Sequence, residues 1–248
     1  TSAAANKGLT GDVAAGSDVD NEGRFQGDGP ELGADELTAD CAVIVAGAPN
    51  DVYNSLQQAI DIAPLNGELL VAGRCTGVQT RQGTPQLAYF HQAVTVRGGY
   101  RNGSWDTSSP ATHPTVLDAQ ELGRVVRVGS GVRVVLANVT LINGNASGLG
   151  GGPGNVDAGG NVYVDNGQFT LQGAEVVYGR ATMGGGIFLR APIALISGSN
   201  FHTNVASQQG GAIYLDTAPT SVQVSSSRFA NNRATDGGAS SAGERAAT

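Results

Sequence analysis

The chain has 248 residues, of which 38 are glycine and one is tryptophan, with 14% charged residues and a net charge of -7. This length corresponds to one domain or to one domain with a tail, and the composition favours many short strands separated by turns over a helical protein. Because no run of 18 apolar residues is present, we expect no membrane span. The lack of a basic face argues against nucleic-acid binding.

Residues 1–40 are rich in Gly, Ala and Asp and contain few large apolar side chains. Nine acidic residues against Lys7 and Arg24 give this segment the whole net charge of the chain. Fixing a backbone costs about 1–2 kcal/mol per residue, more than these few apolar side chains can return. We therefore expect an extended acidic tail over 1–40, ordered by a neighbouring subunit, and a folded domain over 41–248.

The segment that follows the tail reads as a strand and a helix. CAVIVA (41–46) predicts the strand, and DVYNSLQQAIDIA (51–63) predicts an amphipathic helix that ends at Pro64. The apolar face of this helix is formed by Val52, Leu56, Ala59, Ile60 and Ala63. We expect the helix to cover the first strands of the domain and to protect their open edge.

The two cysteines, Cys41 and Cys75, each flank an apolar run, CAVIVAG and LLVAGRC. One interpretation is a pair of buried free thiols. The other, which we predict, is a disulfide that ties the first strand to the next repeat and requires an oxidising compartment. Neither a CxxC pair nor a Cys/His cluster is present, so the pattern predicts no zinc site and no other metal site.

Short β-rich runs separated by glycine-rich turns follow, and the later ones repeat. Three segments align: GGNVYV (159–164), GGGIFL (184–189) and GGAIYL (210–215). Their aligned apolar residues, 25 and 26 positions apart, are Val162, Ile187 and Ile213. The second half of each repeat aligns as well, through Leu141, Val176, Phe201 and Phe229, each followed five residues later by Ala146, Ala181, Ala206 and Ala234. A glycine-rich insert near GLGGGPGNVDAGG lengthens one repeat by about ten residues.

A turn position recurs three residues after these second anchors. It is occupied by Gly144, Gly179, Asn204 and Asn232. Glycine and asparagine tolerate the left-handed backbone conformation better than other residues. We therefore expect a positive φ at this position in every repeat.

A period near 25 residues with β segments predicts one coil of a right-handed parallel β-helix per repeat, an all-β solenoid with a short N-terminal capping helix and an extended tail. A leucine-rich repeat has a similar length, but its leucine-and-asparagine signature is absent. Each coil would bury its inward side chains only by stacking on its neighbours, at a spacing of about 4.8 Å.

The rungs GGAIYL…F…N.A, and the opening CAVIV…SLQQAIDIA…GELLVAGRC…VTVRGGY, resemble secreted bacterial right-handed β-helix repeat proteins, which include polymorphic outer-membrane-type surface proteins within the pectate-lyase-like superfamily. The resemblance covers about 41–238. It implies the fold and an extracellular or cell-surface location. It does not specify an activity, because such proteins include lyases, adhesins and structural proteins.

No catalytic residue is predicted. Lyases of this fold hold calcium with clustered Asp carboxylates, as the resemblance implies, but Arg190 lies between Asp165 and Asp216 in the aligned repeats. We interpret these three as an opposite-charge ladder on a solvated face. His91, His113 and His202 have no partner nearby in the sequence and are interpreted as lone surface histidines. The glycine runs lack the Lys-Ser/Thr of a phosphate loop, and no cofactor is expected.

Alternation along the aligned strands places Tyr163, Phe188 and Tyr214 on the outward face, where we expect them to stack. One interpretation is ordinary stabilisation of a sheet face. The other is an exposed binding stripe for a neighbouring protein or for sugar rings.

Taken together, these features predict a non-enzymatic extracellular structural or surface protein. We expect it to self-assemble into a homo-oligomer or homopolymer, as a filament or surface layer, through its tail and its open ends, because Gly237-Gly238 begins a further repeat whose strands would be left unpaired. The alternative is a carbohydrate-binding module or a polysaccharide-active enzyme, with the aromatic stripe as its platform.

Overall fold

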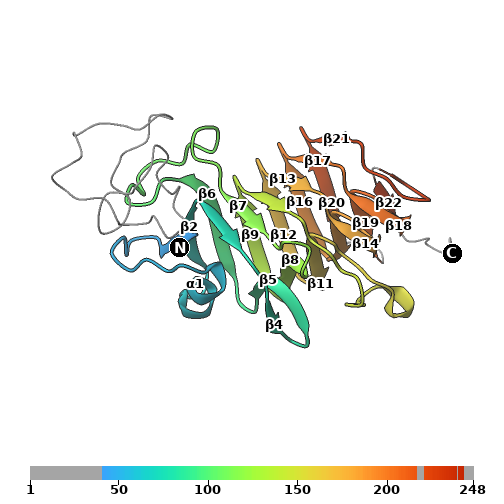
Figure 1. The fold of residues 1–248 in the computed structure, drawn as a ribbon, viewed down its shortest axis with the longest axis horizontal. Helices are drawn as coiled ribbons and strands as arrows, with labels where there is room; N and C mark the ends of the chain where they lie inside the picture. Colours follow the sequence, from blue (N-terminus) through green and yellow to red (C-terminus); the bar gives the residue numbers. More distant parts are fainter. Residues whose placement is uncertain (1–40, 217–220, 239, 243–248) are drawn as a thin grey trace, which may run out of the picture. The chain divides into compact units, whose positions relative to one another are not determined.

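The computed structural model describes residues 41–216, 221–238 and 240–242. The chain divides into two units, 1–40 and 41–248, and the expectation that a neighbouring subunit orders residues 1–40 lies outside the described residues. The second unit is all-β, as predicted, with short strands arranged in parallel sheets (Figure 1). Within these residues, no helix combines the length and the hydrophobicity needed to cross a membrane.

Three sheets carry most of the strands. Sheet I comprises, in spatial order, β1 (Ala42–Val45), β2 (Gly67–Ala72), β6 (Val94–Tyr100), β9 (Arg133–Ala137), β12 (Gln168–Gln172), β16 (Ile193–Ser197) and β20 (Ser221–Ser225). Sheet II comprises β3 (Arg74–Thr76), β7 (Val116–Asp118), β10 (Thr140–Ile142), β13 (Glu175–Val177), β17 (Asn200–His202) and β21 (Arg228–Ala230).

Sheet III comprises β4 (Gln79–Arg81), β5 (Thr84–Phe90), β8 (Arg124–Val128), β11 (Val162–Asp165), β15 (Ile187–Arg190), β19 (Ile213–Leu215) and β22 (Ser240–Ala242). A further pair joins β14 (Arg180–Met183) to β18 (Val205–Gln209). In the described part of the chain, the helices are α1 (Leu56–Ile62) and a 3₁₀ turn at Pro153–Asn155. Every named strand pairing is parallel except β1–β2 and β4–β5.

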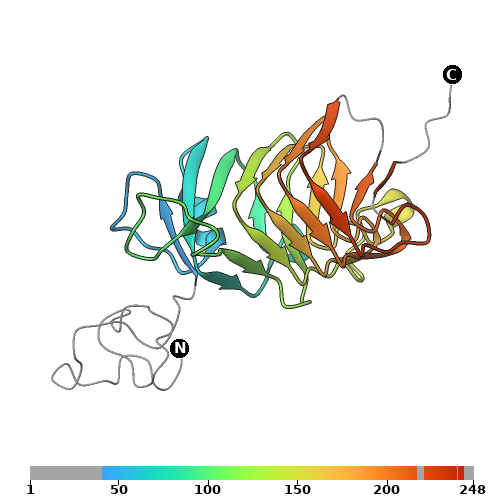
Figure 2. The same ribbon diagram turned by 90° about the horizontal axis from the view of Figure 1, so that it is seen from above.

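The chain visits the sheets in a constant order, from sheet III to sheet I, then to sheet II and back, as in β11, β12, β13, β14 and β15. Equivalent strands of successive repeats therefore lie side by side (Figure 2). The predicted register is confirmed, because Val162 pairs with Ile187 and Ile187 with Ile213. In sheet II, Phe201 lies between Val176 and Phe229.

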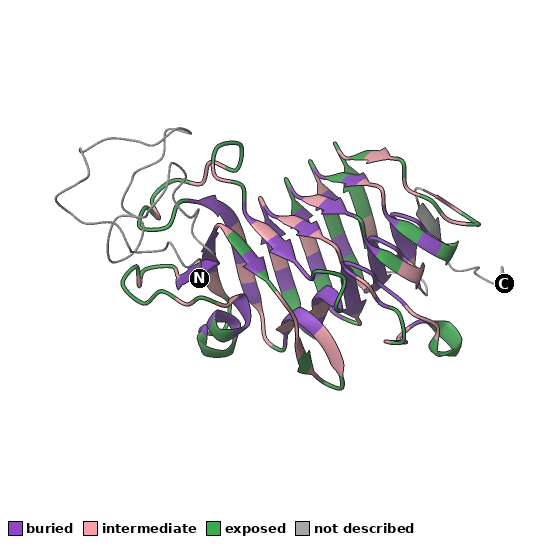
Figure 3. Ribbon diagram, viewed as in Figure 1, coloured by how far each residue is buried: buried purple, intermediate pink, exposed green. Residues whose placement is uncertain are grey.

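The largest apolar core runs between the three sheets (Figure 3). Burial alternates along β12 and β16 of sheet I, whereas β11 and β15 of sheet III are buried on both faces. Phe169, Phe201 and Leu171 are among its fully buried side chains. Phe201 stacks on Phe229 with ring centroids 4.9 Å apart, so the repeat builds a continuous internal column. Each repeat contributes apolar area that only its neighbours can bury.

The glycine pairs of the repeat are explained by two different constraints. Gly159, Gly184 and Gly210 have φ of +68°, +65° and +64°, a conformation that side chains with a Cβ adopt at a cost. Gly185, in the next position, has no room for a Cβ, which would lie 2.5 Å from the carbonyl carbon and oxygen of Val205. The turn therefore requires a flexible residue followed by a small one.

The expected positive φ at Gly144, Gly179, Asn204 and Asn232 is wrong by one residue. The left-handed residues are the preceding ones, Asn143, Tyr178, Thr203 and Asn231. Glycine is required at 144 and 179 because a Cβ there would lie 2.1 Å from a backbone carbonyl oxygen of the next repeat. Asn204 is instead kept by hydrogen bonding, since its side-chain amide donates to Asn232 Oδ1 at 2.9 Å and its Oδ1 accepts from the Gly179 N–H at 2.9 Å.

The N-terminal end of the stack is closed. Leu56, Ala59 and Ile60 of α1 are buried in the core, and α1 contacts β1, β2 and β5. Strand β1 also covers the edge of β2 by antiparallel pairing. The helix therefore caps the first repeat as expected.

The helix is shorter than predicted at its start. Tyr53 forms two backbone hydrogen bonds of 2.8 Å with Val43, so the chain is extended before Ser55, and Val52 is 44% exposed instead of lying on the buried face. This local pairing with β1 overrides the helical periodicity of the sequence.

Cys41 and Cys75 form a disulfide, which confirms the paired interpretation. Cys41 precedes β1 and Cys75 is the central residue of β3, and both are buried in the core. The Cys41 N–H also donates to the Arg74 carbonyl oxygen at 2.9 Å. The bond therefore joins the start of the second unit to the first strand of sheet II.

Candidate functional site

The predicted aromatic stripe is a column of stacked rings on sheet III. Tyr163 pairs in register with Phe188, and Phe188 with Tyr214, and both pairs of ring centroids are 5.4 Å apart. Their neighbours Val162 and Val164 belong to the internal core, whereas the three rings form a separate cluster with Ala158. The rings therefore face away from the internal core, as the alternation predicts.

The expectation that this stripe is exposed is wrong. Tyr163, Phe188 and Tyr214 are 4%, 0% and 4% exposed. The glycine-rich insert folds back over the start of the column, with its Ala158 packed in the ring cluster, and Met183 at the end of β14 also packs against the rings. An open contact surface for a protein or for sugar rings is thus absent at these residues.

Side chains from three successive repeats anchor the insert. Arg124 donates from Nε to the Ala158 carbonyl oxygen at 2.9 Å and from Nη2 to the Gly150 carbonyl oxygen at 2.7 Å. The Tyr163 hydroxyl and Arg190 Nη2 both donate to the Gly151 carbonyl oxygen, at 3.0 and 3.1 Å. These bonds satisfy backbone carbonyls that the insert buries.

The cluster is electrostatically unusual because Arg124 is 1% exposed and forms no ion pair within the described residues. Burial lowers the pKa of Arg124 to about 10, and its guanidinium carbon lies 4.8 Å from the Tyr163 ring centroid. Burial also raises the pKa of the Tyr163 hydroxyl. A guanidinium held by carbonyls and a ring, without a carboxylate, serves to fix the insert.

The opposite-charge ladder lies beside this column as predicted, but the expectation that its face is solvated is wrong at Asp216. Arg190 lies 3.4 Å from the Asp165 carboxylate and 2.8 Å from that of Asp216, which is buried. Burial is the largest influence on the pKa of Arg190 and lowers it, but the hydrogen bond to Asp216 and the charges of Tyr163, Asp216 and Asp165 together outweigh burial and raise that pKa. A guanidinium between the two carboxylates suits charge neutralisation better than paired acid–base chemistry.

Replacement of Arg124 tests this account of the insert. We expect Arg124→Gln to lower the free energy of unfolding by about 2 kcal/mol, because two buried carbonyls lose a charged donor. Hydrogen exchange should rise at 144–158 and stay unchanged at β16. Arg133→Gln, at an exposed arginine, is the control, and equal losses in both variants would contradict the anchoring role.

An open pocket of about 290 Å³ lies on the outer face of sheet II. It is lined by Glu175, Asn200, Phe201, His202, Arg228, Ala230 and Asn231. His202 Nε2 lies 2.7 Å from Glu175 Oε1, and the Tyr178 ring packs edge-on against the imidazole. The interpretation of His202 as a lone surface histidine is therefore wrong.

Sequence reasoning missed this pair because Glu175 and His202 are 27 residues apart. The repeat alignment carries a usable signal, since Glu175 pairs with Asn200 and Val177 with His202, so the two side chains are diagonal neighbours. Nowhere in the described ranges do three His, Cys, Asp or Glu side chains gather as a metal site.

The last repeat leaves the internal column open within the described residues. Val224 lies in register with the buried Ile196 but is 46% exposed, and Phe229 and Val222 are only partly buried. Among the strands of the described residues, β20, β21 and β22 each have one neighbour in their sheets. This end, which we call the open edge, presents unpaired backbone groups and apolar side chains together.

Comparison of the chain with protein-family models, curated proteins and solved structures finds no match.

Proposed function

We propose that residues 41–242 form a right-handed parallel β-helix that acts outside the cell as a non-enzymatic structural protein and associates with a second copy of itself. The fold proposal is supported by the constant order of sheets, the parallel register and the spacing of 25 and 26 residues between stacked positions. These are the properties of a solenoid with one coil per repeat.

The extracellular location is supported by the Cys41–Cys75 disulfide, because such bonds persist mainly in oxidising compartments. The structural role is supported by the contacts of the acidic residues on sheet III, which are engaged in ion pairs. Asp165 and Asp216 are both engaged with Arg190, and the aromatic column is buried by packing.

Self-association rests on one observation, the partial exposure of Val224 at the open edge. Burying an aliphatic side chain fully is worth about 1.5–3 kcal/mol, and each added backbone hydrogen bond contributes about 1 kcal/mol net. The other end is closed by α1 and β1, so the second copy offers its own open edge. A two-fold axis then brings the two edges together as a closed pair. We also propose that the acidic tail, 1–40, of the neighbouring copy strengthens this contact.

The test is the oligomeric state of the full chain by sedimentation. We expect the wild-type protein to form a dimer and Val224→Lys to be monomeric, because a charge at the open edge opposes strand pairing. The control is Ile193→Lys, at a residue of similar exposure (38%) on the outer face of sheet I, which should stay dimeric. A monomeric wild-type protein, or a dimeric Val224→Lys, would show the proposal to be wrong. Removal of residues 1–40 should weaken the dimer.

A further inference from the structure

Met183 lies where the glycine-rich insert (148–160) meets the aromatic column. It is the last residue of β14, and its partly buried side chain packs against the cluster of stacked rings formed by Tyr163, Phe188 and Tyr214. The three rings are almost completely buried. Met183 is therefore the member of this cluster that solvent reaches most readily.

The backbone of Met183 holds the end of the insert. Its N–H donates to the Asp157 carbonyl oxygen at 3.0 Å, and its carbonyl oxygen accepts from the Gly159 N–H at 3.0 Å. The ladder between β14 and β18 shifts register between Ala181 and Met183, and such an irregularity disrupts the regular ladder locally. A displacement of Met183 is thus coupled directly to hydrogen bonds of the insert.

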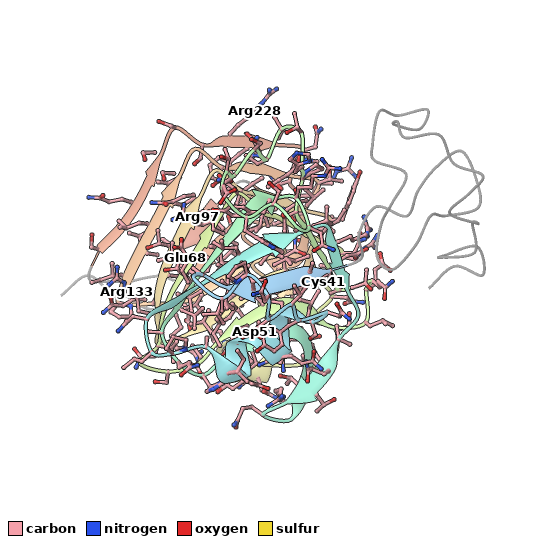
Figure 4. All side chains as sticks on the ribbon, turned by 90° about the vertical axis from the view of Figure 1, so that its left-hand side faces the viewer. Cys41, Asp51, Glu68, Arg97, Arg133 and Arg228 are labelled. Atoms are coloured by element: carbon pink, nitrogen blue, oxygen red, sulfur yellow. A yellow bond between two sulfur atoms is a disulfide. The ribbon has the colours of Figure 1, made fainter. Side chains whose placement is uncertain are left out.

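Met183 also provides the sulfur atom that is available to a peroxide. The sequence contains one methionine and two cysteines, and both cysteines form the Cys41–Cys75 disulfide. Cys41 lies at the N-terminal end of the domain, which faces the viewer in Figure 4. Peroxides oxidise thiolates and thioethers, and a disulfide holds no thiolate. The thioether of Met183 is therefore the sulfur that a peroxide oxidises first.

Oxidation of this thioether changes its packing. The Met183 Sδ attacks one oxygen of hydrogen peroxide, so that an S–O bond forms and the O–O bond breaks. The other oxygen leaves as water with both protons, and the two electrons that sulfur loses reduce the peroxide. A thioether makes favourable contacts with aromatic rings, whereas a sulfoxide is polar and disrupts apolar packing. A sulfoxide that turns to solvent loses the rings, and one that stays places a polar group against apolar surface.

We propose that Met183 is an oxidation site and that its sulfoxide releases the end of the insert from the aromatic column. The release is local, because Arg124 and Arg190 still hold the carbonyl oxygens of Gly150 and Gly151. Enzymes of the sulfoxide-reductase class return the thioether, so the change is reversible. This site goes beyond the proposed function, since β14 is not a strand of the open edge.

The experiment treats the full chain with hydrogen peroxide. Mass spectrometry locates the added oxygen, and amide hydrogen exchange followed by NMR reports on the insert. We expect one oxygen on Met183 and exchange about tenfold faster at the N–H groups of Ala158 and Gly159, which corresponds to about 1.4 kcal/mol. Exchange at β9, the strand of the labelled Arg133, should stay unchanged (Figure 4).

Two variants of Met183 separate oxidation from other effects of peroxide. Met183→Leu keeps an apolar side chain of similar volume without sulfur, so peroxide should leave its exchange rates unaltered. Met183→Gln places a polar side chain against the rings, so its insert should exchange faster before any peroxide is added.

A Met183 that stays unmodified under conditions that oxidise N-acetylmethionine would overturn the oxidation site. Oxidation without faster exchange at Ala158 and Gly159 would overturn the release of the insert, and so would an equal response of Met183→Leu to peroxide. Should Met183→Gln fail to fold, the comparison of the wild-type protein with Met183→Leu still decides the question. Sedimentation before oxidation keeps the two proposals separate, because a monomeric wild-type protein would contradict the proposed function alone.

Discussion

Removal of the disulfide is expected to destabilise the folded protein by about 4 kcal/mol. Cys41 and Cys75 are separated by 34 residues, and closing a loop of that length restricts the unfolded chain by about this amount in the loop-entropy description. The double variant Cys41→Ala, Cys75→Ala removes the bond without leaving a free thiol. Thermal unfolding should shift downward by about 10 °C for a domain of this size.

The loss of stability should also be confined to the N-terminal part of the domain. Each repeat contacts mainly its neighbours, so hydrogen exchange should increase at β1, α1 and β3 and change little at β16 and β20. The control is a reducing agent, which should lower the unfolding temperature of the wild-type protein and leave that of the double variant unaltered. A double variant as stable as the wild type would mean that the closed N-terminal end does not depend on the covalent bond.

Gly185→Ala is expected to cost about 3 kcal/mol or more. A Cβ at this position would lie 2.5 Å from the carbonyl carbon and oxygen of Val205 and 2.7 Å from the carbonyl oxygen of Gly211. These are backbone atoms of the next repeat and are held by the parallel ladder, since Gly185 N–H donates to Gly210 O at 3.1 Å. Overpacking of this kind forces backbone shifts, which typically cost about 1–3 kcal/mol and sometimes more.

Gly131→Ala separates this steric effect from backbone strain. Gly131 has a φ of +73°, but no atom lies within 4 Å of the position that a Cβ would occupy, so only the left-handed conformation opposes alanine, at about 1 kcal/mol. Chemical denaturation of both variants measures the difference. Should Gly185→Ala prove no more damaging than Gly131→Ala, the repeats cannot be stacked as closely as the structure places them.

The repeat period was sufficient to predict the register. Aligning GGNVYV, GGGIFL and GGAIYL correctly paired Val162 with Ile187 and Ile187 with Ile213, and it placed Arg190 between Asp165 and Asp216. These predictions succeed because a stacked repeat contacts mainly the repeats before and after it, so that equal positions in the sequence become neighbours in space.

Local conformation was less predictable. Tyr178 and Thr203 have the positive φ, although neither residue type indicates a left-handed backbone. The glycine and asparagine in the sequence mark the following position instead, where the residue must be small or hydrogen-bonded. The helix α1 begins at Leu56 and not at the predicted residue 51 for a similar reason, because Tyr53 pairs with Val43 of β1. In both places a contact with another segment outweighs the preference of the residue itself.

Two features of the candidate surfaces depend on the three-dimensional path of the chain. The repeat period predicted that Tyr163, Phe188 and Tyr214 stack and face away from the core. The insert that covers the start of this column interrupts the period. Its position is set by hydrogen bonds from Arg124 and Arg190. The Glu175–His202 pair likewise arises from a diagonal contact between adjacent strands. Periodicity shows which residues occupy equivalent positions in successive repeats. The path of an insert, and contacts between residues at different positions of the repeat, depend on long-range packing and hydrogen bonding, which no local sequence pattern encodes.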